Sequence, residues 1–213
     1  MPAEDIRDLG VVSLIFQGSS GPWLCTGVMI SSTQILTAAH CVTESHTDIT
    51  VSGGVQGRAK LRALHPRYLS TPHEDAHRYD LAVLDFDGES AAKVAPLSRA
   101  PVAVGDTLTL TGAGDHEISS DGSPDGIIRL GPAIVWVAGD GLLWIKTEIK
   151  TTDAVTALHG DSGAPVFNGK NELVGIICSG KVYPDKDLGY TTIVDLQSVE
   201  SQDFLKSGLS QID

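Results

Sequence analysis

The sequence predicts an all-β protein built from two packed six-stranded antiparallel β-barrels, with a helix at the C-terminus. About a dozen short apolar or alternating segments follow one another along the chain, as expected for the strands of such barrels. Glycine is frequent, with 23 residues, and supplies turns between these segments. With 213 residues, 41% of them hydrophobic, the chain can form one large core or two small ones.

The expected strands are separated by turn signals. Gly53-Gly54, Asp87-Gly88 and residues 139–141 (Gly-Asp-Gly) favour hairpins or loops between neighbouring strands. Strands are expected at residues 10–16, 23–30, 34–36, 60–63, 81–86, 107–111, 126–130, 133–137, 142–149, 164–167 and 173–177.

Residues 90–104 predict the boundary between the barrels, because they contain two prolines and several alanines. We therefore divide the chain into residues 1–95 and 96–213. From Asp195 onward, apolar residues recur at nearly helical spacing. Asp195 is a suitable N-cap, so the tail predicts the C-terminal helix.

The chain is acidic, with 27 Asp and Glu residues against 15 Lys and Arg residues and a net charge of −12. This surplus disfavours nucleic acid and anionic membranes, so neither is expected as a partner. No apolar run approaches the roughly 20 residues of a membrane-spanning helix. The first five residues are acidic and polar, so we expect no secretory signal there.

Residues 160–165 (Gly-Asp-Ser-Gly-Ala-Pro) form the most informative motif. The hydroxyl of Ser162 becomes a good nucleophile once a base removes its proton. In a tight glycine turn, the backbone N–H groups of Gly160 and Ser162 could hold a developing oxyanion. The same residues also make a good ordinary turn, so the motif needs support from elsewhere in the chain.

That support comes from a histidine and an aspartate in the first half of the chain. His40 follows the strand 34–36, and an imidazole can accept and return a proton near neutral pH. Asp80 opens an apolar run, where it could accept a hydrogen bond from His40 and fix its tautomer. Three other acids compete for this role, and their positions in a polar loop or after the run fit less well: Asp75, Asp85 and Asp87.

Residues 38–41 (Ala-Ala-His-Cys), 80–84 (Asp-Leu-Ala-Val-Leu) and 160–165 occur in the order and rough spacing of the trypsin/chymotrypsin-like serine proteases, which this sequence resembles. Gly-Ala-Pro after the serine replaces the more common Gly-Gly-Pro. Weaker similarity covers nearly the whole chain, and residues 190–194 match the last strand of the fold. The resemblance implies a trypsin-like pair of barrels forming one catalytic unit, with His40, Asp80 and Ser162 in the cleft between them.

The resemblance further implies a serine endopeptidase that cleaves peptide bonds through an acyl-enzyme. Its substrate would be a peptide or protein, no cofactor would be needed, and we expect a monomer. One alternative is a latent or inactive protease-like binding or sensing module that a regulatory partner activates. Another alternative is an esterase that uses the same triad.

The resemblance pairs Cys25 with Cys41 in a disulfide that braces the histidine loop and leaves Cys178 without a partner. A disulfide suggests an oxidising compartment, so we expect a secreted or periplasmic protein. The alternative is a cytoplasmic enzyme with reduced thiols.

Substrate contacts are also transferred from the resemblance. Thr156 stands at the base of the primary pocket and brings no charge, whereas Gly180 should leave one wall open. We therefore expect a neutral pocket for a small or medium apolar side chain, with a basic side chain as second choice. The substrate backbone should add as a strand along residues 178–180. The expected substrate-binding residues are Thr156, Ala157, His159, Cys178, Ser179 and Gly180.

Two metal-like motifs and the N-terminus complete the expectations. Residues 73–77 (His-Glu-Asp-Ala-His) match a zinc-protease pattern, but Pro72 and the nearby Asp80 strand favour an exposed loop. Residues 121–126 resemble a calcium loop, but position twelve is Pro132. We expect no metal site. The chain lacks an Ile-Val-Gly-Gly N-terminus, so Asp161 should pair with a lysine, an arginine or a backbone N–H group.

Overall fold

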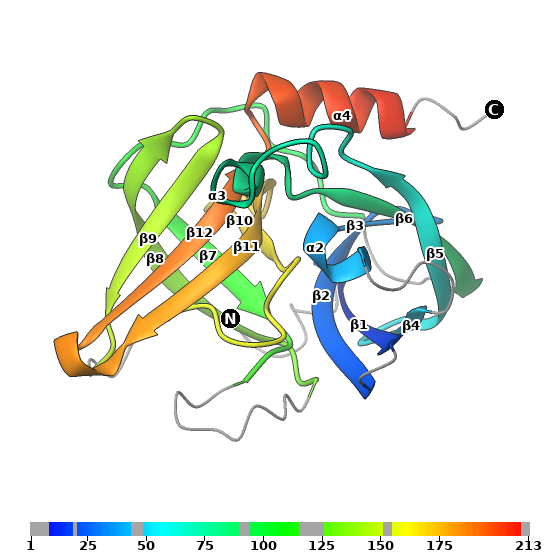
Figure 1. Cartoon of the computed structure of the whole chain (residues 1–213), viewed down its shortest axis with the longest axis horizontal. Helices are drawn as coiled ribbons and strands as arrows, with labels where there is room; N and C mark the ends of the chain where they lie inside the picture. Colours follow the sequence, from blue (N-terminus) through cyan, green and yellow to red (C-terminus); the bar gives the residue numbers. More distant parts are fainter. Residues whose placement is uncertain are drawn as a thin grey trace.

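The computed structural model describes residues 9–18, 21–43, 49–89, 94–115, 126–150 and 155–209. Two closed antiparallel barrels of six strands each are followed by a C-terminal helix, which confirms the predicted fold class (Figure 1). The described helices are all too short or too polar to cross a membrane.

The first barrel has the strand order β1-β2-β3-β6-β5-β4. Its strands are β1 (Val11–Gly18), β2 (Gly21–Ser31), β3 (Gln34–Thr37), β4 (Ile49–Ser52), β5 (Gln56–Leu64) and β6 (Ala82–Glu89). Between them lie the short helices α2 (Ala39–Val42) and α3 (His73–Ala76), and the 3₁₀ turn η1 (His77–Tyr79).

The second barrel has the strand order β10-β11-β12-β9-β8-β7. Its strands are β7 (Thr107–Gly112), β8 (Arg129–Gly139), β9 (Leu142–Glu148), β10 (Pro165–Phe167), β11 (Leu173–Tyr183) and β12 (Leu188–Asp195). The 3₁₀ turn η2 (Pro184–Lys186) closes the long β11–β12 hairpin.

Several predicted strands have shorter bounds than the observed ones, and at two places the number of strands itself differs from the prediction. The sequence analysis missed β4, whose four residues carry too short an alternation to stand out. It also predicted two strands, 126–130 and 133–137, where the structure has the single strand β8. In the structure Gly131 packs under Val155, where a Cβ would overlap that side chain, and the strand continues through Pro132 opposite Thr109.

Three apolar cores hold the molecule together. One fills each barrel, and the third lies between the barrels, where Leu36 and Leu81 from the first meet Phe167 and Ile176 from the second. These four side chains are fully buried. Burial of each contributes about 1.5–3 kcal/mol, so the interface that positions the active site is an apolar core of its own.

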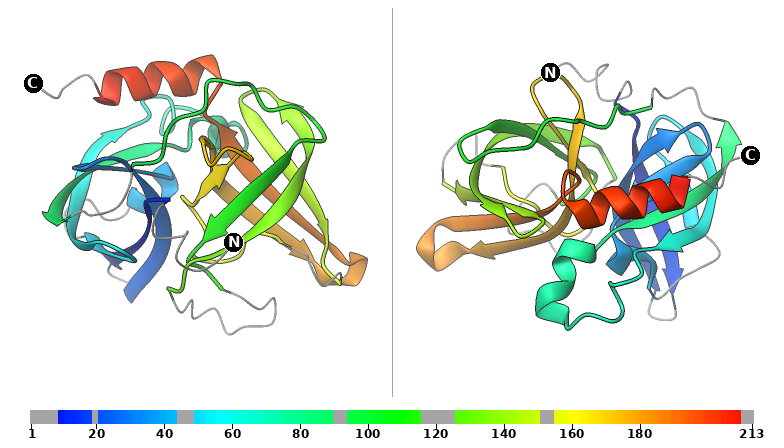
Figure 2. Two further views of the ribbon diagram at one scale, coloured as in Figure 1. Left: turned by 180° about the vertical axis from the view of Figure 1, so that it is seen from behind. Right: turned by 90° about the horizontal axis from the view of Figure 1, so that it is seen from above.

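Helix α4 (Val199–Leu209) follows the second barrel but packs on the first, as Figure 2 shows. The Arg62 guanidinium donates to the Gly208 carbonyl, and the rings of His65 and Phe204 lie 5.1 Å apart. The predicted N-cap, Asp195, was wrong. Asp195 ends β12 and binds the N–H of Gln197, whereas the Ser198 hydroxyl accepts from the Ser201 N–H and caps the helix.

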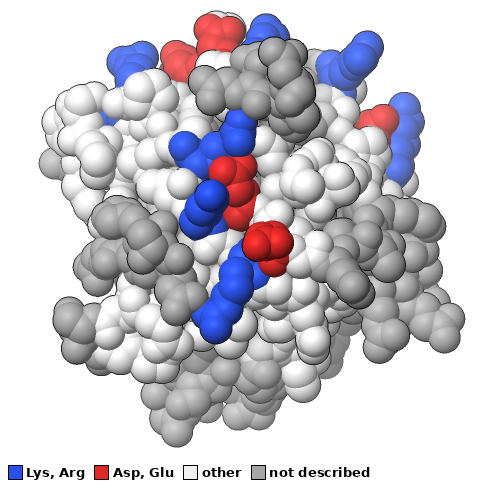
Figure 3. Space-filling view, turned by 90° about the vertical axis from the view of Figure 1, so that its right-hand side faces the viewer, with Lys and Arg blue, Asp and Glu red and all other residues white. Residues whose placement is uncertain are grey.

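The outer wall of the first barrel carries charges of both signs side by side. Arg58 on β5 lies opposite Asp87 on β6, Lys60 lies opposite Asp85, and Arg62 donates to Asp85 at 2.8 Å. Figure 3 shows a face of the molecule on which basic and acidic side chains alternate in this way. Such mixing offers no single-sign field for nucleic acid on that face.

Candidate active site

Asp80 holds His40 by two hydrogen bonds. Its Oδ2 lies 2.6 Å from His40 Nδ1, and its Oδ1 accepts from the His40 backbone N–H at 2.8 Å. Burial lowers the pKa of His40, but the hydrogen bond and the negative charge of Asp80 more than offset it, so the pKa lies above 6.5. Asp80 is only 2% exposed, and His40 is its ion-pair partner. The imidazole is therefore oriented, with Nε2 left for chemistry.

The competing acids do not reach His40. Asp85 is paired with Arg62, Asp75 lies 3.8 Å from Arg78, and Asp87 faces Arg58 across β5 and β6. Asp80 differs from them because it directly follows η1, whose turn brings it beneath the α2 helix that carries His40.

The turn at 160–164 leaves two backbone donors free. Asp161 N–H donates to the Leu158 carbonyl, Gly163 N–H to the Ile177 carbonyl, and Ala164 N–H to the Asp161 carbonyl. No acceptor among the described residues binds the N–H groups of Gly160 and Ser162. Gly160 has φ of 93°, a conformation that glycine adopts without strain. The turn therefore presents the two donors that the sequence analysis assigned to an oxyanion.

Thr26 of the first barrel binds the serine turn of the second barrel through hydrogen bonds. The Thr26 N–H donates to the Ser162 carbonyl at 2.8 Å, and its hydroxyl donates to the Gly160 carbonyl at 2.8 Å. The same hydroxyl accepts from the Ala113 N–H at 3.0 Å. Sequence reasoning missed Thr26. Its signal was weak, because a threonine inside an apolar strand reads as an ordinary strand residue.

Gly163 shows how closely the two barrels meet. Its φ is 83°, and a Cβ there would overlap Thr37 Oγ1 and the Thr26 carbonyl. Thr37 in turn donates to the Thr26 carbonyl at 2.7 Å. Only glycine satisfies both the backbone conformation and the available space.

Thr26→Val is expected to lower the free energy of unfolding by about 2 kcal/mol. The substitution leaves the buried Gly160 carbonyl and Ala113 N–H without their hydrogen-bond partner, the Thr26 hydroxyl. The serine turn loses the hydrogen bond from the Thr26 hydroxyl to Gly160, so kcat should fall more than KM changes. Thermal unfolding and steady-state kinetics measure both effects. Thr109→Val is the matched control, because the Thr109 hydroxyl makes no hydrogen bond with described residues. Equal effects of the two substitutions would contradict the assignment.

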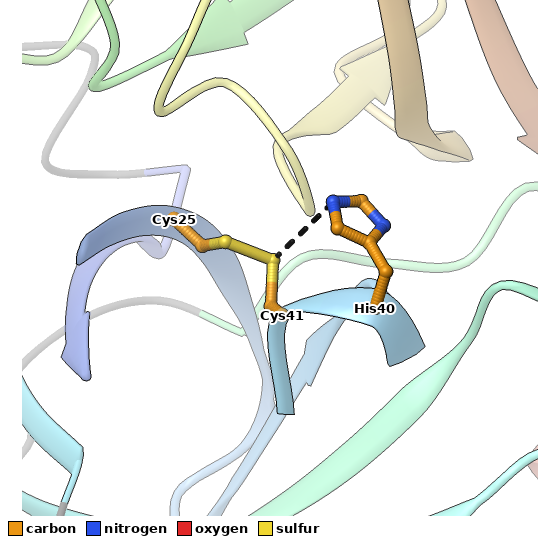
Figure 4. A group of neighbouring side chains, drawn as sticks. All are labelled: Cys25, His40 and Cys41. Carbon is orange, nitrogen blue, oxygen red and sulfur yellow. Dashed lines mark hydrogen bonds between the residues drawn. A yellow bond between two sulfur atoms is a disulfide. The ribbon is translucent and has the colours of Figure 1, made fainter. Parts of the chain in front are cut away.

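The predicted disulfide between Cys25 and Cys41 is confirmed and lies beside His40 (Figure 4). Cys41 Sγ is 3.9 Å from His40 Nε2 and 3.8 Å from the Ser162 carbonyl oxygen. The disulfide therefore contacts both the imidazole and the serine turn. Within the described part of the chain, no hydrogen bond joins the Ser162 hydroxyl to His40 Nε2. Cys25, His40 and Cys41 have potential ligand atoms within 4.8 Å of one another, but metals bind thiolates, and these sulfurs are joined.

Asp161 is held by backbone donors. Its carboxylate accepts from the Leu158 N–H at 2.8 Å and from the Gly114 N–H at 2.9 Å. Burial raises the pKa of Asp161 to about 6, against the lowering effect of these two donors, and the charge of Asp115 adds to the rise. Backbone N–H groups were among the expected partners. The expectation about the N-terminus concerns residues 1–8, which lie outside the described residues.

The walls of the expected pocket stand close together. A Cβ on Gly180 would overlap the Ala157 carbonyl, and one on Gly189 would lie 2.7 Å from Thr156 Oγ1. Thr191 is also uncharged, and its Oγ1 accepts a hydrogen bond from the Ala157 N–H at 2.9 Å. Gly180 therefore lies directly against the Ala157 backbone, and the side chains of Thr156 and Thr191 bring hydroxyls but no charge. Asp187 lies after η2 and pairs with Lys150 at 3.7 Å.

The other expected contact residues occupy different environments. Cys178 is buried at a bulge between β11 and β12, donates to the Thr192 carbonyl, and has a pKa raised by burial. Ser179 is half-buried and Gly180 exposed on the same strand. The His159 side chain is 89% exposed, with Nδ1 3.8 Å from Asp115. Cys178 is thus shielded from solvent, whereas Ser179, Gly180 and His159 are all at least partly accessible.

The two metal-like motifs have different outcomes. Residues 73–77 form α3 and the start of η1, so the expectation of a loop was wrong. Pro72 stands at the N-cap of this single turn, and its carbonyl accepts a hydrogen bond from the Asp75 N–H at 2.9 Å. In the calcium-like motif, residues 121–125 lie outside the described residues.

Comparison with known proteins identifies relatives of the whole fold. The family model described as Trypsin matches residues 10–199. Human granzyme M is 31% identical over 196 residues, covering 75% of this chain and 70% of granzyme M. Trypsin 5G1 of Aedes aegypti is 28% identical over 194 residues, covering 79% of this chain and 69% of that protein.

Bacterial proteases are similar as well. Glutamyl endopeptidase of Staphylococcus aureus strain MW2 is 26% identical over 177 residues, covering 77% of this chain but only 49% of that protein. A solved structure of Glu endopeptidase in complex with MPD superposes with a TM-score of 0.68 at 19% identity, covering 96% of this chain and 92% of that one. The chain therefore belongs to the trypsin family and is a trypsin-like serine endopeptidase.

Proposed function

We propose that this protein hydrolyses peptide bonds through an acyl-enzyme formed on Ser162, with His40 as base and Asp80 as its positioning partner. The observation that carries the proposal is the paired geometry around His40. A buried carboxylate binds both its Nδ1 and its backbone N–H, and the serine turn lies against the adjacent disulfide. Both barrels contribute to the site, so we propose that they act as one catalytic unit and as a monomer.

In the proposed reaction, Ser162 Oγ attacks the scissile carbonyl while His40 Nε2 takes the hydroxyl proton. Asp80 stabilises the imidazolium that forms. The free N–H groups of Gly160 and Ser162 bind the oxyanion of the tetrahedral intermediate. The leaving amine then takes the proton from His40. Water, deprotonated by the same imidazole, releases the acyl group and restores Ser162.

The missing hydrogen bond between Ser162 and His40 is compatible with this mechanism. Catalytic hydrogen bonds are often long before substrate binds and shorten in the complex. Thr26 binds the Ser162 carbonyl, so we expect the Ser162 hydroxyl to approach His40 Nε2 by rotation about the Cα–Cβ bond when substrate binds.

Labelling with a fluorophosphonate tests the proposed nucleophile. Native protein should form a phosphonyl ester at Ser162 with loss of fluoride, identified by mass spectrometry of the digested chain. Ser179→Ala should be labelled equally, because Ser179 lies in the neighbourhood but has no base. Heat-denatured protein should not react. Failure of the native protein to react would favour the latent binding or sensing module instead.

We propose that Thr156, Ala157, Gly180 and Thr191 line a narrow neutral slot for the side chain before the cleaved bond, and that this slot prefers small neutral side chains. The walls meet at Gly180 and Ala157, and Thr156 with Thr191 supplies hydroxyls but no charge. The names of two relatives indicate action at glutamate, but the described residues that line this slot include no cation to bind a carboxylate.

A digest of a peptide library should therefore show cleavage after alanine, serine or threonine. Glutamate and arginine should be cleaved at least about tenfold more slowly, because an uncompensated charge would enter the slot. Thr156→Ala removes bulk from the base and should shift cleavage toward longer apolar residues. An unchanged preference in this variant would show that Thr156 does not line the slot.

We also propose that the protein works outside the reducing cytoplasm, in the periplasm or as a secreted enzyme. The Cys25–Cys41 disulfide supports this proposal, because such bonds persist in oxidising compartments.

A further inference from the structure

Two histidines next to the active site lie one helical turn apart. His73 begins α3 and His77 begins η1, and their ring centroids are 5.8 Å apart with the planes at 76°. His73 is exposed and His77 half-buried, so solvent reaches the pair. The peptidase mechanism uses neither ring.

This spacing suits a shared metal ion. Zinc–nitrogen bonds are about 2.0–2.1 Å long, so two imidazoles on one tetrahedral ion hold their ring centroids about 5–6 Å apart. The 5.8 Å separation of His73 and His77 falls in this range. Imidazole is a favoured ligand of zinc, copper and nickel, whereas calcium and magnesium prefer oxygen.

The pair lies where a bound cation would affect catalysis. Figures 1 and 2 show α3 over the junction of the two barrels, and η1 packs against β12. Asp80 follows η1 directly, and electrostatic interactions of Asp80 and His40 reach His77.

We propose that His73 and His77 bind one divalent transition-metal ion, such as Zn²⁺, and that the bound ion inhibits peptide cleavage. A dication bound at His77, which interacts electrostatically with His40, disfavours the imidazolium that forms when Ser162 loses its proton, so the rate falls. Of the side chains that the structure describes, only these two are placed to bind the ion. Water fills the remaining positions, and binding is reversible. The inhibitory part rests on the proposed function, whereas metal binding does not.

Metal binding is measured first, on untagged full-length chain by calorimetry with Zn²⁺ alone. One ion per chain is expected for the native protein. Loss of an outer-shell partner of a metal commonly costs 10–100-fold in affinity, so loss of a ligand in His73→Gln should cost at least about tenfold. His159→Gln is the control, because this exposed histidine should leave binding unchanged. Unchanged affinity in the His73→Gln/His77→Gln double variant overturns the site.

Inhibition is measured separately, with a peptide substrate and with chelator as the metal-free reference. Native activity should fall several-fold at saturating Zn²⁺, and by up to about tenfold for one unit of lost His40 basicity. His73→Gln should keep native activity in chelator and resist zinc. Equal inhibition of the native protein and the double variant would mean that zinc acts directly at His40, and this overturns the proposal. A chain that binds zinc at the pair but cleaves no peptide refutes only the proposed function.

Discussion

Ser162→Ala is expected to lower the rate of peptide cleavage by about 10⁶-fold, because no other group in the described site can form the acyl-enzyme. The backbone donors of the turn remain, so a small residual rate above that in water should persist. The Ser162 hydroxyl makes no hydrogen bond in the described structure, so its loss should leave unfolding stability within about 0.5 kcal/mol. Single-turnover kinetics and thermal unfolding measure the two quantities.

The comparison with Ser179→Ala makes this result specific. Ser179 is half-buried on β11, where a substrate strand would pair with its backbone and not with its hydroxyl, so Ser179→Ala should change the rate little. A Ser162→Ala protein that still cleaves at the native rate would remove the nucleophile from the proposed mechanism. A lower Tm for Ser162→Ala would indicate that the turn itself had been damaged.

Asp80→Asn is expected to lower kcat by about 10⁴-fold at pH 7. The carboxylate accepts from both the ring and the backbone N–H of His40, and an amide offers only one acceptor oxygen for these two donors. The ring would lose its fixed tautomer, and the imidazolium would lose the adjacent negative charge. kcat should carry the effect, since Asp80 is buried away from substrate.

The pH profile distinguishes this role from simple loss of structure. Cleavage requires neutral His40, so the native rate should rise with pH through a His40 pKa above 6.5. In Asp80→Asn the two raising effects vanish and the lowering effect of burial remains, so this limb should move to lower pH. A limb at unchanged pH would mean that Asp80 does not control His40. Circular dichroism of both proteins provides the control for folding.

The predicted parts of the molecule share one property, which is that their signal lies within a few neighbouring residues. The motif around His40, the start of the strand at Asp80 and the serine turn are each readable locally. Most strands of the two barrels also follow from short apolar runs. The family resemblance then supplied the arrangement of these pieces, including the disulfide between Cys25 and Cys41.

The features that escaped prediction depend on contacts between distant segments. Thr26 lies 134 positions before Gly160, whose carbonyl it binds, and nothing in its own strand marks that contact. Gly180 meets the Ala157 carbonyl, a contact that only the closed barrel brings about. The helical turn at His73 and the cap at Ser198 were missed because small differences in local chain direction decide them.

The way Thr26 and Gly163 interlock has a consequence for engineering. A chimaera that joins the first half of this protease to the second half of a relative would inherit the serine loop without the groups shaped to receive it. Such chimaeras should be active only when the two parent proteins match at these two positions. Recombination breakpoints should therefore be chosen so that both positions come from the same parent.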